Sequence, residues 1–327
     1  MSGRSDRPSV VVVGGGHGCS RSLTALRRLD VARTAVVTVA DDGGSSGRLR
    51  RDHDVVALGD LRMAMLALAA GADEGSRATV VALSRRRFAR GELAGHSLGN
   101  LLLLGLLEEL GGDLDAALRT FGELLGVDGR VLPVTHEPVT LMAETDTGMV
   151  EGQAAVATAH RIHRVRIDPS EAVLAPGVAE AVATADLVLL GPGSLYTSVL
   201  PVLLVPGMAA AMRATSAGVV LVGNLREQPG ETEGMDLADH AEALQQHVDG
   251  LRIDAVLAHE RAPGRAVATG ARTPLVIDET RLLTRVGRVV RDDLGDELDG
   301  HDPERLAGAV GRLLADATAG ALGRASQ

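Results

Sequence analysis

The first forty residues carry an ordered series of apolar and polar segments. Residues 9–13 are a short continuous apolar run typical of a buried strand, and residues 14–18 are a glycine-rich turn. Residues 19–29 have the spacing of a helix, and residues 35–40 repeat the β-branched apolar pattern of a strand. The chain therefore opens with a predicted βαβ unit.

The remainder of the first half predicts helices followed by a group of strands. Helical patterns cover 60–70 and 97–110, while the pattern at about 78–90 fits either a helix or a strand. Between about 130 and 168, strand patterns separated by turn residues predict an antiparallel β insertion. Its predicted strands are Arg130–Thr135, Val139–Glu144 and Arg161–Ile167.

The alternation of strands and helices resumes after this insertion. Strand patterns occur at 186–190, at 218–223 and near 253–258, and a helical pattern covers about 206–215. Strands that alternate with helices are typical of a parallel sheet with helices on both faces. The fold predicted for the chain is therefore α/β: a Rossmann-like, mostly parallel sheet carrying the antiparallel β insertion.

The last sixty residues predict one further strand and helix. Asp302, Pro303 and Glu304 have the types expected at the N-cap, the first position and the first turn of a helix. Residues 265–271 have the composition of a loop, and the last ten residues that of a frayed end. We predict a nucleotide-binding domain at 8–260, with the segment 261–327 packed on the same domain.

Composition narrows the classes of ligand. Hydrophobic residues make up 45% of the 327 and aromatic residues only 1%, so the core must be aliphatic and base-stacking platforms are not expected. The net charge of -10 opposes binding to nucleic acid and to anionic membranes. All basic residues are Arg, which excludes a Schiff base or a Walker A lysine. An anion must then be held by Arg, backbone amides or a metal ion.

Cysteine usage and the lengths of the apolar runs bear on the compartment. Cys19 is the single cysteine, which excludes an intrachain disulfide and agrees with a reducing compartment. The valines before Gly14 are too few for a signal peptide, and Leu101–Leu107 is too short to cross a bilayer. Prolines interrupt the longer apolar stretch Leu187–Met212. We expect a cytoplasmic protein without a membrane segment.

The first candidate motif is the glycine turn Gly14–Gly18, which lies between a predicted strand and a predicted helix. Backbone amides at a helix N-terminus bind phosphate, and side chains at such a turn would block its close approach. The dinucleotide fingerprint is incomplete, because Cys19 stands where a third glycine or alanine is usual. A purely structural turn is the alternative interpretation.

The second motif follows the second predicted strand. Asp41 and Asp42 stand about where a ribose-binding acid is expected, and either carboxylate could also hold a metal ion. Ser45 and Ser46 could donate to a phosphate that Arg48 would neutralise. A solvated turn is the simpler alternative.

Two further polar loops follow later strands and should reach the same edge of the sheet. Residues 191–198 place hydroxyls beside two glycines, and residues 224–232 offer an Asn amide and an Arg. Tight connections without a ligand are the alternative. Together with the first two motifs, these loops predict a nucleotide cleft. The predicted ligand-binding residues are Gly14, Gly15, Gly16, His17, Gly18, Asp41, Asp42, Ser45, Ser46, Asn100, Gly191, Gly193, Ser194, Thr197, Asn224 and Arg226.

No catalytic or metal-binding spacing stands out. His96 begins a predicted helix and could orient a ligand, or serve equally as a structural histidine. His160 and His163 have an odd spacing that points them to opposite faces of a strand, which disfavours a metal site. No nucleophile elbow, zinc helix or kinase loop set occurs. We therefore assign neither catalytic residues nor metal ligands.

The motifs together resemble the YvcK-like gluconeogenesis factors over nearly the whole chain. The matching segments are GGGHG at 14–18, VTVADDGGSSGRLR at 37–50, ELAGHSLGNLLL at 92–103, GPGSLYTSVLPVLLVPG at 191–207 and NLREQPGETEG at 224–234. The sequence departs from the family at His17, where Thr is general, and at Leu58, Arg226 and Glu227, where Pro, Met and Thr are common.

The resemblance implies a phospholactate-transferase-like Rossmann fold that binds UDP-N-acetylglucosamine. It implies a regulatory role that couples carbon supply to cell-wall precursor synthesis and cell shape, with no required cofactor. Mg²⁺ could accompany the nucleotide, a glucosamine-6-phosphate-forming enzyme would be a plausible partner, and a homo-oligomer stays open.

Two enzymes compete with this interpretation. The first is a phospholactate-transferase-like enzyme with a nucleotide-linked donor and a metal ion on Asp41 and Asp42. Those transferases usually carry a Pro-Ser-Asn-Pro loop where this chain has GPGSLYTS. The second is an NAD-dependent oxidoreductase, for which the sequence offers no acid or base to place beside a nicotinamide.

Overall fold

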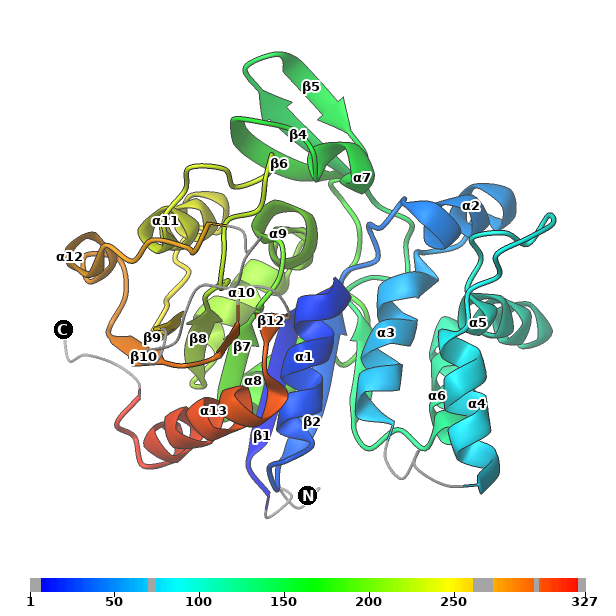
Figure 1. The fold of residues 1–327 in the computed structure, drawn as a ribbon, viewed down its shortest axis with the longest axis horizontal. Helices are drawn as coiled ribbons and strands as arrows, with labels where there is room; N and C mark the ends of the chain where they lie inside the picture. The colour runs from blue at the N-terminus through cyan, green and yellow to red at the C-terminus, as the bar shows by residue number, and fades with distance from the viewer. Residues whose placement is uncertain (1–6, 70–74, 261–272, 297–299, 323–327) are drawn as a thin grey trace.

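The computed structural model describes residues 7–69, 75–260, 273–296 and 300–322 (Figure 1). Its centre is a seven-stranded sheet in which every neighbouring pair is parallel. From one edge to the other the strands are β10 (Val289–Asp292), β9 (Ala255–His259), β8 (Gly218–Val222), β7 (Leu187–Leu190), β1 (Ser9–Gly14), β2 (Ala32–Val37) and β3 (Arg130–Pro133). The predicted Rossmann-like α/β fold is confirmed.

The strand order reverses beside β1. The chain proceeds from β1 to β2 and β3 on one side, then returns to β7 on the other side of β1. The loops after β1 and β7 diverge to opposite faces at such a reversal, which leaves a crevice at the carboxyl ends of the strands. The glycine-rich turns at 14–18 and 191–194 both begin at this point.

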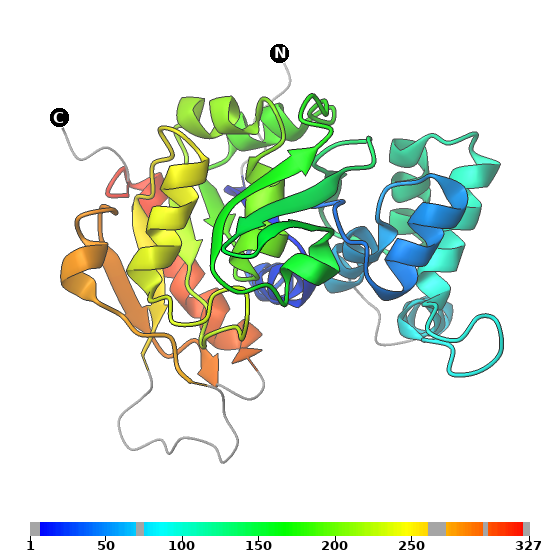
Figure 2. The same cartoon turned by 90° about the horizontal axis from the view of Figure 1, so that it is seen from above.

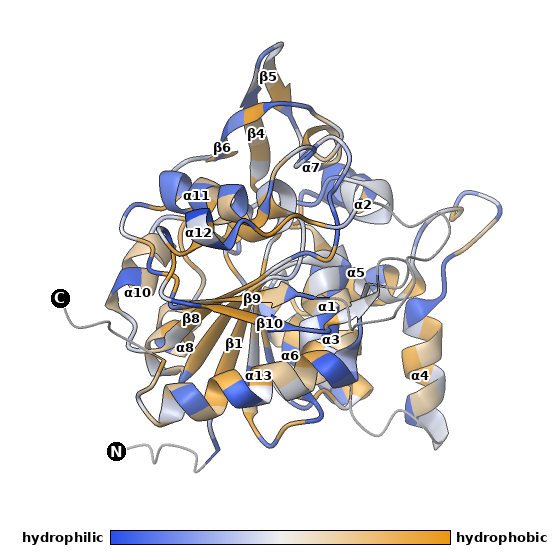
Figure 3. Cartoon of the chain, turned by 60° about the vertical axis from the view of Figure 1, so that its left-hand side comes forward, coloured by the Kyte–Doolittle hydropathy of each residue, from blue (hydrophilic) through white to orange (hydrophobic). Residues whose placement is uncertain are grey.

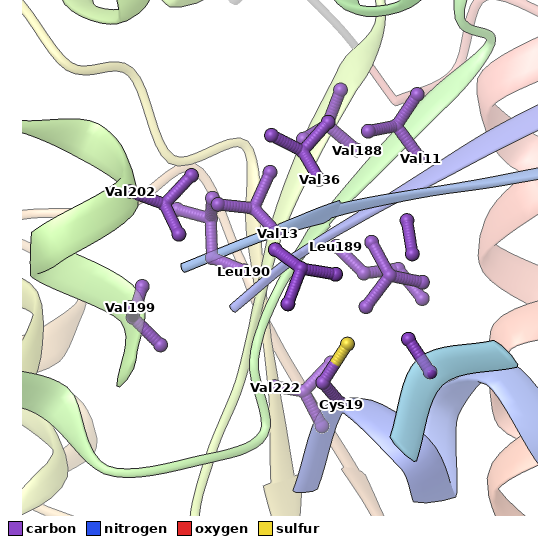
Figure 4. Close-up of a cluster of buried hydrophobic side chains, with 14 of the residues drawn as sticks. Val11, Val13, Cys19, Val36, Val188, Leu189, Leu190, Val199, Val202 and Val222 are labelled. Carbon is purple, nitrogen blue, oxygen red and sulfur yellow. The ribbon is translucent and has the colours of Figure 1, made fainter. Parts of the chain in front are cut away.

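Helices cover both faces of the sheet (Figures 1 and 2). On one face, α1 (Gly16–Leu26) packs against α3 (Leu58–Leu68) and α13 (Pro303–Thr318). On the other face, α8 (Val178–Thr184) and α9 (Leu200–Leu203) pack against α10 (Met208–Ala214). Aliphatic side chains fill the layers between them, among them the valines and leucines of β1 and β7 and the lone cysteine (Figure 4). The hydropathy colouring shows the strands of the sheet as the most apolar part of the interior (Figure 3).

The predicted final helix is confirmed at its first residue. The Asp302 carboxylate accepts from the backbone amides of Glu304 and Arg305, and Pro303 occupies the first turn. A short antiparallel pair, β11 (Gly295–Asp296) and β12 (Gly300–His301), leads into α13. The loop predicted at 265–271 and part of the predicted frayed end lie outside the described residues.

A helical lobe connects β2 to β3. It contains α2 (Gly44–His53), α3, α4 (Gly75–Arg85), α5 (Leu98–Glu109) and α6 (Leu114–Leu125). The helices predicted at 60–70 and 97–110 are confirmed within two residues, and the open segment near 78–90 is helical as far as Arg85. Helix α2 was not predicted, because its first turn consists of glycine and serine, which are poor helix formers.

The antiparallel insertion is confirmed, with different bounds. Its three strands are β4 (Thr140–Thr145), β5 (Gly148–Glu151) and β6 (Ile162–Asp168). A short helix, α7 (Gln153–Val156), lies between β5 and β6 in the chain. Arg130–Pro133, predicted as part of the insertion, is instead β3 of the main sheet and pairs in parallel with β2. A strand of four residues with two buried positions has the same apolar pattern in a parallel and in an antiparallel sheet. The sequence pattern therefore could not decide to which of the two sheets this strand belongs.

Strand β2 begins at Ala32, three residues before the predicted start. Arg33 makes this part of the strand look polar, yet the residue is buried. Its guanidinium donates to the carbonyls of Leu26 and Leu29 and pairs with Asp128 at 2.5 Å. A buried arginine that satisfies its donors in this way is compatible with a core strand.

Three other helical segments complete the described structure: the π-helix η1 (Leu195–Val199), α11 (Leu237–His247) and α12 (Glu279–Leu282). Helix α11 starts with a capping box formed by Asp236 and Asp239. Within the described ranges no single helix has the length and apolarity to cross a membrane. The pair Leu195–Leu203 and Met208–Ala214 passes that test only jointly, with a bend of 78° between its halves.

Candidate functional site

A cleft of about 640 Å³ opens where the strand order reverses. The loops after β1, β2, β7 and β8 border it, together with residues of α1, α3, α7 and β12. Its lining residues are Gly15, Gly16, His17, Gly18, Arg21, Asp41, Asp60, Met63, Gln153, Pro192, Gly193, Ser194, Ser198, Asn224, Leu225, Arg226, Gln228, Gly300 and His301. A groove of similar volume between α6 and β3 contains none of the predicted ligand residues.

The glycine turn after β1 needs three of its glycines for different reasons. A Cβ on Gly15 would collide with the Asp60 carboxylate, and one on Gly18 would collide with the carbonyl of Pro192. Gly16 has φ of +61° and open space in front of its Cα, where it faces the cleft. Helix α1 starts at Gly16, so its first amides and the positive end of its dipole are directed at the cleft.

The turn after β7 is held in shape by side chains from the turn after β8. Asn224 accepts from the Gly193 amide at 3.2 Å and donates to the Gly193 carbonyl at 3.0 Å. Gln228 donates to the Ser194 hydroxyl at 2.7 Å. Asn224, which we predicted to contact a ligand, thus has its amide engaged with the adjacent loop, and it borders the cleft as well.

A second buried carboxylate holds the continuation of this turn. Glu231 accepts from the amides of Tyr196 and Thr197 at 2.7 and 3.1 Å and from the Thr197 hydroxyl at 3.0 Å. Burial raises the pKa of Glu231, and these three donors oppose that shift. Thr197 therefore serves to fix η1 and does not line the cleft.

Two carboxylates, Asp41 and Asp60, face the cleft from neighbouring elements. Burial, together with the nearby charge of Asp41, raises the pKa of Asp60 to about 7, although the Gly16 amide donates to this carboxylate. Carboxylate oxygens are suitable Mg²⁺ ligands. Among the described residues no group of three or more His, Cys, Asp or Glu side chains could hold a metal. Asp41 and Asp60 fit such an ion only if phosphate oxygens or water complete its coordination.

Positively charged side chains also line the cleft. Arg21 on α1 and Arg226 after β8 both line it. His301, which also lines the cleft, is buried, and its Nε2 lies 3.0 Å from the Gly223 carbonyl just after β8. Burial lowers the pKa of His301 to about 4, so the ring is neutral at physiological pH and its Nε2 donates to that carbonyl. Two arginines and a helix N-terminus thus line the cleft, and both kinds of group attract an anion.

Ser45 and Asn100 lie off the cleft, in a buried hydrogen-bond network. The Ser45 hydroxyl accepts from the side-chain amide of Asn100 at 3.1 Å and from the backbone amide of Ser97 at 3.4 Å. Because both of its acceptor sites are then occupied, its own proton is directed to His96 Nδ1, at 3.1 Å. The Asn100 carbonyl oxygen accepts from Arg62 at 2.7 Å. Burial and nearby Arg48 lower the pKa of His96, which keeps its ring neutral. This network fixes the start of α2 against α5.

Asp42 points away from its neighbour Asp41 and toward the β insertion. Its carboxylate accepts from the Ala154 amide at 2.8 Å, in the first turn of α7. Asp42 therefore joins the loop after β2 to the insertion, and it does not line the cleft.

This placement yields a prediction for two adjacent substitutions. Asp42→Ala removes a cap-like acceptor at α7 and is expected to lower the free energy of unfolding by about 1 kcal/mol, with little change in nucleotide affinity. Asp41→Ala removes a cleft residue and should change the affinity with little effect on stability. Urea denaturation and calorimetric titration of both variants would measure the two effects. Loss of binding in Asp42→Ala alone would contradict the placement of both residues.

The predicted residues thus divide into two groups. Those that line the cleft are Gly15, Gly16, His17, Gly18, Asp41, Gly193, Ser194, Asn224 and Arg226, and those that do not are Gly14, Asp42, Ser45, Ser46, Asn100, Gly191 and Thr197. Cleft residues on distant or unmarked elements were not predicted from the sequence, chiefly Arg21, Asp60, Met63, Gln153, Gly300 and His301. Asp60 had one available signal, an acid in the first turn of a predicted helix.

The two histidines of the insertion bind separate acids. His163 Nε2 lies 2.5 Å from Asp146, and His160 Nδ1 lies 3.0 Å from Glu233. The carboxylate of Asp146 also accepts from Arg161, and these contacts lower its pKa.

Comparison with known proteins identifies the family to which the chain is similar. Residues 10–294 match the model of the family described as 2-phospho-L-lactate transferase CofD. A relative in Mycobacterium tuberculosis (strain H37Rv) is 48% identical over 266 residues, which cover 78% of this chain and 77% of the relative. The "Gluconeogenesis factor" of Listeria monocytogenes is 36% identical over 323 residues, or 96% of this chain and 98% of its own.

A solved structure shares the whole fold. A crystal structure of a UPF0052 family member from Bacillus halodurans superposes with a TM-score of 0.85 at 35% identity. The match covers 94% of this chain and 99% of that one. The family match, the close relatives and the shared architecture agree, and the chain therefore belongs to the CofD family, within its group of gluconeogenesis factors.

Proposed function

We propose that this protein is a cytoplasmic regulator that binds UDP-N-acetylglucosamine in the cleft at the strand-order reversal. In this proposal, ligand occupancy reports the supply of cell-wall precursors. It thereby links carbon metabolism, including gluconeogenic growth, to peptidoglycan synthesis and cell shape. A partner that reads the occupied state would be an enzyme forming glucosamine 6-phosphate. Such control requires that ligand and partner favour the same conformation of the protein.

One observation carries the choice of ligand class: the amino end of α1 and two arginines, Arg21 and Arg226, face the same cleft. A diphosphate bears two negative charges, and helix N-termini and guanidinium groups are the usual protein partners for them. The cleft volume of about 640 Å³ is within the usual range for small-molecule sites. Amides and hydroxyls on Asn224, Gln228 and Ser194 supply the polar surface that a sugar requires.

A binding role is supported by the position of the one serine–histidine pair described above. Ser45 and His96 have the geometry of a nucleophile and a base, but both are buried and outside the cleft lining. A substrate in the cleft would not reach that hydroxyl. The pair therefore serves the fold, and the cleft residues are suited to holding an anion.

A second candidate function, a transferase with a nucleotide-linked donor, is favoured by the pair Asp41 and Asp60. A carboxyl with a pKa of about 7 beside a second carboxylate can exchange a proton at physiological pH or share a divalent cation. Mg²⁺ held there would neutralise charge on a transferring phosphate group. The family description as a phospholactate transferase agrees with this candidate.

The raised pKa of Asp60 predicts how affinity depends on pH. Below about pH 7 the carboxyl is protonated, whereas above it a second negative charge appears beside Asp41 and repels the diphosphate. Without divalent cations, the affinity for UDP-N-acetylglucosamine is expected to fall by up to about tenfold per pH unit above 7. Titrations between pH 6 and 8 would measure this slope.

Asp60→Asn is the matched control for that titration. Its side chain can still accept from the Gly16 amide but has no charge to gain, so its affinity should be nearly independent of pH. Added Mg²⁺ should flatten the wild-type profile as well. An affinity that rises with pH in the wild-type protein would contradict the assignment of Asp60 to the ligand cleft.

Product analysis distinguishes the regulator from the transferase. Wild-type protein is incubated with UDP-N-acetylglucosamine and Mg²⁺, and phosphorus NMR follows the diphosphate over hours. The regulator leaves the nucleotide sugar intact while a thermal shift reports its binding. Release of UMP or UDP, with water accepting the sugar phosphate or the sugar, at a rate that Asp41→Ala abolishes would show that the cleft catalyses transfer chemistry instead.

A further inference from the structure

The outer edge of strand β3 carries backbone groups that pair with no other described strand. β3 is the last strand of the sheet, and it pairs with β2 alone. The Val134 amide donates to the Val37 carbonyl at 2.9 Å, and backbone groups alternate in direction along a strand. In this register the N–H of Leu132 faces β2, while the N–H and C=O of Val131 face away from it. Among the described residues none accepts from the Val131 amide.

A groove of about 670 Å³ lies beside this unpaired edge. Helix α6 forms one wall of the groove, and Gly129–Leu132, Met65 and Pro176 complete the lining. Leu118 and Gly122 give the wall of α6 an apolar surface with room for a side chain. Folded proteins normally cover an edge strand or protect it with charge, because its free backbone groups can pair with another chain. The groove leaves that edge accessible.

The chain itself covers only the carboxyl end of the edge. Thr135 and Leu174 form an isolated antiparallel bridge, and the Ala175 amide donates to the Val134 carbonyl at 2.9 Å. The chain then turns away at Gly177, which has φ of +80°, and enters α8. A segment added antiparallel to β3 would therefore continue the line of residues 174–175 along the unpaired part of the strand.

The charges at the two ends of the groove have opposite signs. Asp115 lies at the carboxyl end of β3, because its carboxylate is 3.0 Å from Nε2 of His136, and Asp113 lies close to it at the start of α6. Exposed Arg130 lies at the amino end of β3. The other two charged residues of the lining are an ion pair on α6, at 3.7 Å. An antiparallel segment would match these charges with a basic residue near its amino end and an acidic residue near its carboxyl end.

We propose that the groove beside β3 is the docking site for an extended segment of a partner protein, which adds to the sheet as an antiparallel strand. The segment is basic, then apolar, then acidic. Its backbone pairs with the N–H and C=O of Val131, and its apolar side chains pack on Leu118, Gly122 and Met65. In such strand addition the main chain gives affinity and the side chains give selectivity. The groove shares no lining residue with the nucleotide cleft, so this inference does not rest on the proposed function.

A synthetic peptide tests the docking. The probe is the fluorophore-labelled, amidated peptide Lys-Val-Val-Val-Glu, and fluorescence anisotropy measures its binding to the full chain. The wild-type protein should bind the probe saturably below about 1 mM. N-methylation of the valines removes the backbone donors and should abolish binding, and the reversed order Glu-Val-Val-Val-Lys should bind more weakly. Absence of saturable binding, equal binding of the N-methylated peptide or preference for the reversed order would each overturn the proposal.

Two variants place the peptide in the groove. Val131→Pro removes the outward N–H and should weaken binding by about tenfold or more, with little change in melting temperature, because proline is tolerated where an edge N–H faces outward. Gly122→Leu should also weaken binding, since its Cβ fits at 3.7–3.8 Å from Val127 and Met65 and the larger side chain takes up space in the groove. Gly105→Leu on α5, outside the groove and with open space at its Cβ, is the matched control and should bind as the wild type does. Wild-type affinity in both Val131→Pro and Gly122→Leu would overturn the assignment of the groove.

Discussion

Replacing Gly16 by valine is expected to weaken binding of UDP-N-acetylglucosamine by more than about a hundredfold, or about 2.7 kcal/mol, while the protein stays folded. Gly16 is the first residue of α1 and faces the cleft, and space in front of its Cα is open. A branched side chain there would occupy the position from which a phosphate reaches the first amides of the helix. Calorimetric titration of the variant measures the loss.

Gly44 is the matched control for this substitution. Like Gly16 it begins a helix, has a positive φ of +47° and has open space at its Cβ position, but it does not line the cleft. Both variants pay the same cost of an L residue in a left-handed conformation, roughly 1–2 kcal/mol. Gly44→Val should therefore lose stability and keep its affinity. Equal loss of affinity in the two variants would mean that backbone strain, and not obstruction of the cleft, explains the effect.

Removal of the Glu231 carboxylate is expected to lower the free energy of unfolding by about 3 kcal/mol or more, since three buried donors lose their acceptor. Those donors are the amides of Tyr196 and Thr197 and the Thr197 hydroxyl, all in η1. The same contacts hold the carboxyl side of the turn at 191–194, so Glu231→Ala should weaken nucleotide binding too. Urea denaturation measures the first effect and titration the second.

Glu231→Gln separates hydrogen bonding from charge at this position. The Gln carbonyl oxygen can still accept from both amides, and its amide nitrogen can donate to the Thr197 hydroxyl oxygen. Because burial already disfavours the charged carboxylate, this variant should lose less than half of the stability that Glu231→Ala loses. If the two variants were equally unstable, the hydrogen bonds to η1 would not be the source of the effect.

The sequence predicted the parallel sheet because short apolar runs alternate with helical patterns along much of the chain. The run at 9–13 and the run at 186–190 both end in turns that contain glycines of positive φ, Gly14 and Gly16 in the first and Gly191 and Gly193 in the second. Strand order brings those two turns together, so the prediction of one cleft follows once the sheet is known to be parallel. Single strands such as Arg130–Pro133 could not be assigned to a sheet from four residues.

The side chains within each loop were harder to predict than the loops themselves. Asp41 and Asp42 are adjacent, yet one lines the cleft and the other caps α7. The helix that begins at Gly44 turns Ser45 inward to His96, and that helix was hidden by its glycine and serine content. The direction in which a loop side chain points depends on where the next helix starts, and the pattern of apolar residues did not show that start.

Some cleft residues have no local signal in the sequence. His301 reaches the cleft from β12, more than one hundred residues beyond the turn after β7. Gln153 arrives from the β insertion, whose packing over the sheet depends on contacts such as the one between Asp42 and Ala154. Only the folded arrangement brings these side chains to Gly16 and Arg226.

Calorimetric titration of the wild-type protein with UDP-N-acetylglucosamine, and then with NAD and GTP, each with and without Mg²⁺, tests the central claim most directly. The proposed regulator binds the UDP-sugar selectively, with one site per chain, and Gly16→Val loses that binding. Preference for GTP would move the protein to the transferases and preference for NAD to the dehydrogenases. Absence of binding to the UDP-sugar under all these conditions would contradict the proposed function.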